Sequence, residues 1–451
     1  MATLPRFVPV QPPRTPDWVS VWRGFAGERL RNSVHGWPEP AFDVLHKRRK
    51  VLGFTVHIVS DPAAVERVLL TNKANYLRPA IAHRILSPLV GNGLLSAEGD
   101  DWKTQRRIVA PTFAPGMVAS MAATMDECAL GEIARWPDGT ARIDMADAAT
   151  KTTMAIIAHS LFGGDTRLTQ GIASQHIEAL VMASGQARFT TLLGVQDWDP
   201  SPIMRRARTA RAWLRTTLGE IVRERGSEGG ADDFFGGLIR SLHTAFPAAQ
   251  AAELAVDNAV TFYVAGHETT ANALAWTIYC LAAQPGLQDE VRAEAIAALA
   301  YPPGERFDKL SLLRQCLEEA MRLYPPAPRF DREAQADDEL AGEPIAKRDL
   351  ISIWPWVIHR HRALWDDPDR FDPSRFAPEA KATHHRYQYI PFGGGPRVCV
   401  GARFATMEAL VILARWLEAR RFALPTGFRP DPVGGVTLRP RGGMPLLVSG
   451  V

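Results

Sequence analysis

The chain has 451 residues, of which 46% are hydrophobic and 22% are charged, so it is long and apolar enough to bury a large core. The formal net charge of +3 is too small an excess to indicate a nucleic-acid-binding protein. The four cysteines, Cys128, Cys280, Cys316 and Cys399, include no CxxC pair, which argues against a zinc site or a disulfide framework and favours a reducing compartment.

The N-terminal segment, residues 1–20, is rich in proline. Arg6, Arg14 and Asp17 interrupt every apolar run in it, so it resembles neither a signal peptide nor a membrane anchor. We therefore expect a cytoplasmic protein.

Helical patterns dominate the first half of the chain. Asp61 is expected to cap a helix that runs through Leu70, and another helix is expected to follow Asp101 and end near Pro111. The segment GSEGGADD, residues 226–233, is the best candidate for an exposed loop. Helices are also predicted over residues 146–163, 170–187 and 203–225.

The longest helical pattern covers residues 247–284. A helix of about 38 residues would extend roughly 57 Å. Its apolar part, residues 259–283, is long enough to suggest a membrane span, but His267, Glu268 and Asn272 lie in the middle, where polar groups are costly in lipid. This pattern therefore predicts the central core helix of a large domain.

The pattern changes after about Tyr324. Residues 325–391 alternate prolines with short apolar runs, which predicts strands and irregular coil, and a final helix is expected over residues 402–420. The tail, rich in glycine and proline, predicts a few short strands. The expected fold is mainly α with a minor β part, in one domain over residues 1–451 with no alternation of strands and helices.

The segment PFGGGPRVCVGARF, residues 391–404, places Cys399 in a glycine-rich turn just before a helix. The amides of Val400 and Gly401 and the positive charge of Arg397 could stabilise a thiolate, while the three preceding glycines can adopt unusual backbone angles. An ordinary buried cysteine after a tight turn is the alternative. A phosphate-binding loop is excluded because there is no GK[ST] ending.

The central helix carries the sequence AGHETT over residues 265–270. The zinc-protease pattern HExxH fails here because Ala271 stands at its last position. Thr269 can donate to the carbonyl of Ala265 and bend the helix, and Glu268 would be costly in a core unless hydrated or paired. An incidental polar cluster on a buried helix is the alternative.

The cysteine segment resembles the haem-binding signature F-x-x-G-x-R-x-C-x-G of the cytochrome P-450 superfamily. Its fixed positions are Phe392, Gly395, Arg397, Cys399 and Gly401. The resemblance implies a haem-thiolate monooxygenase that binds haem b (iron protoporphyrin IX) in a mainly helical fold, buried between the central and C-terminal helices. It implies Cys399 as the axial ligand of the iron, Arg397 as the partner of a haem propionate, and Phe392 and Gly401 as further cofactor contacts.

The central segment is similar to the family's oxygen-activation motif A/G-G-x-D/E-T-T/S. The resemblance implies that Glu268 and Thr269 are catalytic and deliver protons during oxygen activation. It also implies that Ala265 lies against the cofactor.

Three further matches concern charged or aromatic residues along the chain. Trp102 and Arg106 match W-x-x-x-R, and Arg332 matches a weaker position; all three are implied to contact the propionates. The alternative for the first pair is an amphipathic helix with a solvated basic face.

Glu319 and Arg322 match E-x-x-R, and Arg375, in FDPSRF, matches P-x-R-F. The resemblance implies that these three charges form one buried structural network behind the haem. Surface ion pairs are the alternative.

The substrate pocket is expected to be apolar. Core packing is the alternative for each of its expected wall residues, and we expect an apolar organic substrate. The wall residues are Val260, Phe262 and Ala265, then Ala327, Pro328 and Phe330, then Val436, Thr437 and Leu438.

Hydroxylation of such a substrate needs O2 and two electrons. The chain has no dinucleotide-binding fingerprint, so a separate donor is expected, most simply a ferredoxin with an NAD(P)H-dependent reductase. Arg107, Arg403 and Arg362 are the candidate docking cations on the cysteine side. We expect a monomer with no nucleic-acid partner and no membrane anchor.

Two other functions are compatible with a haem site. One is a peroxide-driven or oxygen-independent haem-thiolate enzyme, and the other is a haem sensor without turnover. The intact pair Glu268–Thr269 argues against both, because delivering protons to bound O2 is the purpose of such a pair.

Overall fold

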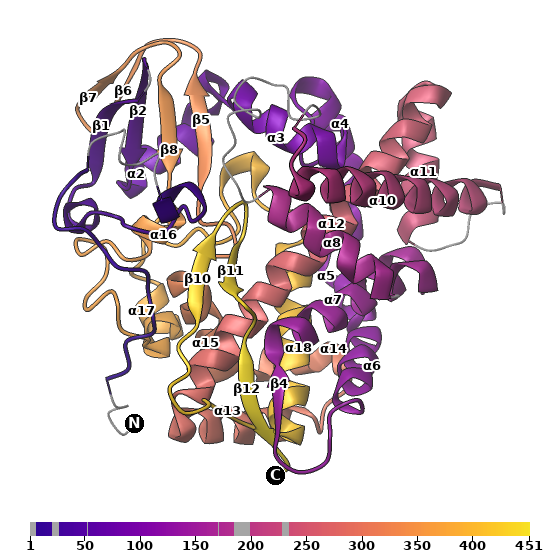
Figure 1. The fold of residues 1–451 in the computed structure, drawn as a ribbon. Coiled ribbons are helices and arrows are strands. Elements are labelled where there is room, and N and C mark those ends of the chain that lie inside the picture. Colours follow the sequence, from indigo (N-terminus) through magenta and orange to yellow (C-terminus); the bar gives the residue numbers. More distant parts are fainter. Residues whose placement is uncertain (1–5, 20–26, 52, 170, 185–198, 228–233) are drawn as a thin grey trace.

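The computed structural model describes residues 6–19, 27–51, 53–169, 171–184, 199–227 and 234–451. Most of the helices form one large group, and most of the strands lie together beside it (Figure 1). The described helices are α2 (Pro62–Glu66), α3 (Ala80–Val90), α4 (Gly99–Val109), α5 (Pro115–Ser120), α6 (Ala122–Ile133), α7 (Met145–Phe162), α8 (Gly171–Ser184), α10 (Pro202–Ser227), α11 (Phe234–Ala245), α12 (Ala248–Ala282), α13 (Pro285–Ala298), α14 (Pro303–Arg306), α15 (Ser311–Leu323), α16 (Pro355–Ile358), α17 (Pro378–Lys381) and α18 (Ala402–Ala419).

The largest sheet has five strands in the order β1-β2-β8-β5-β3, and only β2 and β8 run parallel. A three-stranded sheet, β4-β12-β9, and two hairpins, β6-β7 and β10-β11, complete the β part. The strands are β1 (His46–Val51), β2 (Phe54–Val59), β3 (Tyr76–Leu77), β4 (Ala141–Asp144), β5 (Phe330–Ala334), β6 (Asp338–Leu340), β7 (Glu343–Ile345), β8 (Leu350–Ile353), β9 (Arg421–Ala423), β10 (Asp431–Gly434), β11 (Leu438–Arg441) and β12 (Pro445–Ser449).

Helix α12 is the centre of the helical part, as its apolar pattern predicts. It packs against α7, α10, α11, α15 and α18, and every residue from Thr270 to Ala282 is buried. In the described part of the chain, no single helix is long and apolar enough to cross a membrane. A bent pair, Gly99–Phe113 with Pro115–Ile133, meets that test of length and composition only when its two halves are taken together.

The predicted helices are confirmed with small shifts of their ends. Asp61 caps α2, where its Oδ1 accepts the Ala64 N–H at 2.7 Å, and a wider turn continues to Thr71. Two positions of the predicted loop, Gly226 and Ser227, form the last residues of α10 instead. The rest of that loop, and the end of the helix predicted over 170–187, lie outside the described residues.

The hairpin β1–β2 is an element that the sequence pattern did not predict. The run HKRRKV of β1 has the composition of a solvated basic surface, which hides its period of two. The hairpin pairs Arg49 with Val56 and Lys47 with Ile58, so one of its faces carries both basic and apolar side chains.

A buried charge network lies between α15 and the segment that leads to the cysteine. The Arg322 Nε and Nη2 atoms donate to the two carboxylate oxygens of Glu319 at 2.6 and 2.8 Å, and both side chains are fully buried. The Arg375 Nε atom lies 3.5 Å from Glu319, with 12% of its side chain exposed. The structure therefore joins these three charges inside the protein rather than at its surface.

His359 connects this network to the next segment of the chain. Its Nδ1 donates to the Arg322 carbonyl at 3.2 Å, and its Nε2 accepts the Ile390 N–H at 2.9 Å, so only the neutral ring satisfies both bonds. Burial, reinforced by the nearby Arg322 charge, lowers the pKa of His359 to about 3.

This lowered pKa predicts a loss of stability in acid. The unfolded chain binds a proton at His359 near pH 6.5 and the folded chain does not, so its contribution is present above pH 6.5 and is lost as the pH falls toward 3. The free energy of unfolding should fall between pH 7 and pH 4.5 in the wild type, and this fall should be smaller by about 2 kcal/mol in His359→Gln. Denaturant titration at the two pH values measures it. His243→Gln, at an exposed position on α11, is the control. A wild-type pH dependence in His359→Gln would contradict this interpretation.

Candidate active site

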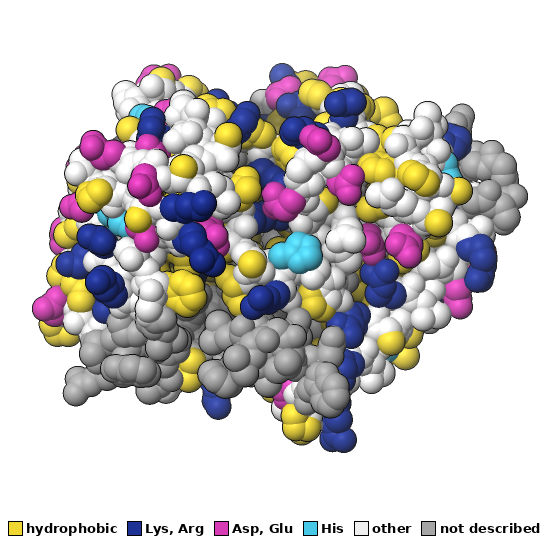
Figure 2. Space-filling view, turned by 90° about the horizontal axis from the view of Figure 1, so that it is seen from above, with side chains coloured by type: hydrophobic (Ala, Val, Ile, Leu, Met, Phe, Trp, Pro, Cys, Tyr) yellow, Lys and Arg dark blue, Asp and Glu magenta, His cyan; other side chains and the backbone are white. Residues whose placement is uncertain are grey.

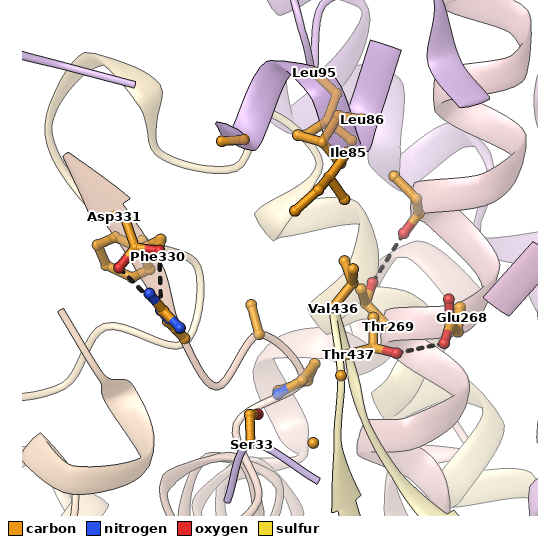
Figure 3. Close-up of a pocket in the computed structure, with 18 of the residues that line it drawn as sticks. Ser33, Ile85, Leu86, Leu95, Glu268, Thr269, Phe330, Asp331, Val436 and Thr437 are labelled. Carbon is orange, nitrogen blue, oxygen red and sulfur yellow. Dashed lines mark hydrogen bonds and ion pairs between the residues drawn. The ribbon is translucent and has the colours of Figure 1, made fainter. Parts of the chain in front are cut away.

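A cavity of about 1230 Å³ lies where α12, α4, β5, the β10–β11 turn and the loop before α18 meet. Figure 3 shows Glu268 and Thr269 on α12 facing Val436 and Thr437 of the turn, with Ile85 and Leu86 of α3 nearby. All eight residues expected at the cofactor line this one cavity. They are Trp102, Ala265, Arg332, Phe392, Arg106, Arg397, Cys399 and Gly401.

The cysteine loop owes its shape to a close backbone approach. Gly395 has a φ of +65°, and a Cβ there would lie 1.9 Å from the Leu69 carbonyl oxygen, so a side chain cannot be accommodated. The Cys399 N–H then donates to the Phe392 carbonyl at 2.9 Å and closes the loop. The same loop turns the cysteine side chain into the cavity wall.

The Cys399 sulfur is accessible from the cavity and enclosed by protein elsewhere. Burial raises the pKa of the Cys399 thiol, while the Gly401 N–H and the nearby Arg106 charge act in the opposite direction. The cation near the sulfur is therefore Arg106, whereas the sequence pattern assigned that role to Arg397. Because burial dominates, a bound metal cation is what would hold this sulfur as a thiolate.

Four arginines lie together in the cavity wall. Burial and the charges of neighbouring arginines lower the pKa of Arg397 to about 10, and burial together with the Arg78 charge lowers that of Arg332 to about 10. Two carboxylates lie near them. Glu98 accepts from Arg397 Nη2 at 2.6 Å and lies 3.7 Å from Arg78, and the charge of Asp331 acts on Arg332. The Arg106 guanidinium has no hydrogen-bond partner among the described residues, and its nearest opposite charge is Cys399. The cluster therefore has an excess of positive charge that suits a bound dianion.

Trp102 contributes an aromatic surface to this cluster. The Arg397 guanidinium carbon lies 4.2 Å from the centre of the indole ring. Arg78 is a member of the cluster that the motifs did not indicate, because it belongs to none of them and lies in the short connection between β3 and α3.

The polar pair on α12 has the local geometry expected from the sequence. The Thr269 hydroxyl donates to the Ala265 carbonyl at 2.9 Å. The Glu268 carboxylate accepts a short hydrogen bond from the Thr437 hydroxyl, as the dashed line in Figure 3 marks. Burial raises the pKa of Glu268, opposed by the Thr437 hydrogen bond and the Arg439 charge. Thr437 was expected only as a pocket wall, and nothing in the local sequence indicated that it would contact Glu268.

Gly266 of α12 also lines the cavity. A Cβ at this position would lie 2.6 Å from Ile157 Cδ1, so the missing side chain also lets α7 pack closely against α12.

Glu408 on α18 is a fully buried carboxyl group near Thr270 of α12 that the sequence analysis did not identify. Neither of its carboxylate oxygens has a hydrogen-bond partner among the described residues. The Thr270 hydroxyl nevertheless lies close enough to act in the direction of a lower pKa for Glu408. Burial outweighs this effect and raises the pKa of Glu408 well above its usual value. An acidic residue inside the apolar run MEALVIL is the signal that could have identified it.

The expected pocket walls divide into two groups. Those that line the cavity are Phe262, Ala265, Ala327, Phe330, Val436 and Thr437. Val260, Pro328 and Leu438 do not line it and were wrongly placed there. Val260 and Leu438 are fully buried in the core, because helical and strand periodicity turns them away from the cavity, and Pro328 is buried where its carbonyl accepts the Trp356 N–H.

The donor set fits haem. A thiol in the wall of a large, mostly apolar cavity can supply an axial ligand, and the excess of arginines can bind two propionates. In the described residues, no group of three or more His, Cys, Asp or Glu side chains could hold a metal ion.

Comparison with known proteins gives the same result. The cytochrome P-450 family model matches residues 48–446. Cyclooctatin synthase of Streptomyces melanosporofaciens is 30% identical over 87% of this chain and 84% of that protein. From the same organism, cyclooctat-9-en-7-ol 5-monooxygenase is 31% identical over 78% and 75%. Cytokinin hydroxylase of Arabidopsis thaliana is 31% identical over 80% and 72%.

A solved structure, the cytochrome P450DA heme domain, has the same fold. It has a TM-score of 0.81 at 24% identity and covers 98% of both chains. The match of the family model over most of the chain, together with relatives at 30% identity or more, establishes the family. The chain belongs to the cytochrome P-450 family and is a haem-dependent monooxygenase.

Proposed function

We propose that Cys399 is the axial ligand of the haem iron, that Trp102, Arg106, Arg332 and Arg397 bind the propionates, and that Glu268 and Thr269 deliver protons. The observation that carries this proposal is the single cavity that all these side chains line. When bound, haem with a thiolate ligand supplies the oxygen-activating iron and the electron density that favours O–O cleavage.

Thr269 and Glu268 have the properties that proton delivery requires. The Thr269 hydroxyl proton is directed to the Ala265 carbonyl, so its oxygen can accept a hydrogen bond from a group in the cavity. The raised pKa of Glu268 lets it hold a proton closer to neutral pH than an exposed carboxyl group does. Apolar walls such as Phe262 and Val264 limit the access of water to this pair.

We propose that Thr437 positions the Glu268 carboxyl group. Its hydroxyl is the hydrogen-bond donor to that carboxyl group among the described residues, and it belongs to the turn next to Val436, which lines the cavity with 44% of its surface exposed. A substrate that contacts this turn would therefore act on the orientation of Glu268.

We also propose an apolar substrate and a ferredoxin as the external electron donor. Arg107 and Arg403 are exposed and suit an acidic donor, whereas Arg362 forms ion pairs with Glu39 and Asp43 that neutralise its charge. The four cysteines are all unpaired, which supports a cytoplasmic location that cell fractionation can test.

The cysteine and threonine roles predict two separable defects. We expect Cys399→Ser to abolish the red-shifted Soret band of the reduced carbon monoxide complex, because thiolate coordination is lost. We expect Thr269→Ala to lower product formed per NADH consumed by about 10-fold or more and to release hydrogen peroxide. Thr277→Ala, on the same helix but buried away from the cavity, is the control. An unchanged Soret band in Cys399→Ser, or full coupling in Thr269→Ala, contradicts the corresponding role.

The Thr437 role predicts a spectroscopic change. Thr437→Val removes the donor that stabilises the Glu268 carboxylate, so the carboxyl group should stay protonated to higher pH. Infrared difference spectra over a pH series, with Glu268→Gln used to identify the carboxyl band, measure this shift. Thr437→Ser should restore the wild-type titration and Thr277→Val should leave it unchanged. An unshifted band in Thr437→Val argues against a positioning role.

The donor proposal predicts a charge-dependent association rate. Arg107→Glu and Arg403→Glu should slow association with a ferredoxin by about 10-fold at low salt, because steering depends on unpaired surface charge. Arg362→Glu should change the rate less. An association rate that changes neither with salt concentration nor with the Arg107→Glu and Arg403→Glu substitutions would rule out electrostatic steering by this surface.

A further inference from the structure

The cavity-facing side of the β1–β2 hairpin carries an arginine within an apolar surface. Alternation along the strands places Arg49, Val51, Phe54, Val56 and Ile58 on the cavity wall. Their strand neighbours Arg48 and Lys50 do not line the cavity and are exposed. Arg48 and Lys50 are therefore solvated, whereas Arg49 faces the cavity.

A second arginine, Arg29, also lines the cavity, and its charge acts on Arg49. The Arg49 Nη2 donates to the Val19 carbonyl at 2.7 Å, and the Arg49 guanidinium lies 5.2 Å from the centre of the Trp18 ring. The Arg29 Nη2 donates to the Gly36 carbonyl at 2.7 Å. Burial, and the charge of Arg29, lower the pKa of Arg49.

Neither arginine has a carboxylate partner among the described residues. The carboxylates that line the described part of the cavity are Glu268 and Asp331, and both have other partners: Thr437 for the first, and Arg329 and Ser352 for the second. Two interacting, partly buried cations without a protein anion form an electrostatic site that an anionic ligand would complete.

The cavity is open to solvent at this end. Phe54 lines it and yet is 61% exposed, so the hairpin tip borders an opening. The face of the molecule in Figure 2 has a hollow near its centre, bordered by basic, acidic and histidine side chains. A ligand that enters beside the hairpin would pass Arg29 and Arg49 before it reaches the apolar interior.

We propose that Arg29 and Arg49 form an anion site that binds the carboxylate of an amphiphilic substrate, whose hydrocarbon part occupies the apolar cavity. This inference rests on the proposed function, because it takes the cavity as the substrate site. The planar fork of a guanidinium matches a carboxylate, and the neighbouring Val51 and Val56 offer apolar contact to the adjoining chain. The substrate class is therefore an organic acid with a long or polycyclic hydrocarbon part.

The test compares matched acids and alcohols of 8 to about 16 carbons, such as dodecanoate and 1-dodecanol, on the holoenzyme. Binding is followed by isothermal calorimetry and by the change in the haem absorption. We expect at least one carboxylate to bind more tightly than its alcohol, and its affinity to fall as salt rises. Arg49→Gln and Arg29→Gln should each weaken the carboxylate about 10-fold and leave the alcohol within about twofold.

Arg48→Gln is the matched control, because it removes a charge from the same strand but from the exposed side. It should bind both ligands like the wild type. The inference is overturned if no acid in the series binds better than its alcohol, or if the double variant Arg29→Gln/Arg49→Gln keeps the preference. The carbon monoxide spectrum tests the proposed function on its own, because it reports the ligand of the iron. Calorimetry tests the anion site on its own, because it measures ligand binding whatever the ligand of the iron is.

Discussion

The structure of the site depends on one close contact between two backbone segments. Gly395 lies against the Leu69 carbonyl, where any side chain would clash, and this contact fixes the turn that carries Cys399. The turn determines the direction of the Cys399 sulfur, and therefore where a haem iron could be bound relative to α12. The arginines in the cavity wall could bind the same haem only if that direction is maintained.

Buried charge supports the turn from behind. Arg322 and Glu319 neutralise one another in the core. Arg322 also donates to the carbonyls of Pro368 and Arg370, so its side chain fixes the irregular segment that contains them. Removing either partner would leave an uncompensated charge in a low-dielectric interior, which is strongly unfavourable. The network thus gives irregular backbone the rigidity that helices obtain from their own hydrogen bonds.

The sequence predicted the features whose chemistry is local. The cysteine turn, the polar pair of α12 and the E-x-x-R pair each lie within a few residues, so spacing alone relates their members. Contacts between distant segments were not predictable. The contact of Thr437 with Glu268 spans 169 positions, and Arg78 belongs to the arginine cluster without belonging to any motif. Val260 and Leu438 were misplaced because an apolar residue near a site can face either the cavity or the core, and composition does not distinguish the two.

His359 has a consequence for how the cysteine is held. It donates to the Arg322 carbonyl of α15 and accepts from the N–H of Ile390, the residue just before the cysteine segment, while the neighbouring Tyr389 hydroxyl donates to the Glu318 carbonyl of the same helix. A ring that must stay neutral therefore helps to hold the segment that leads to Cys399. The direction of the cysteine side chain thus depends in part on a histidine that does not line the cavity.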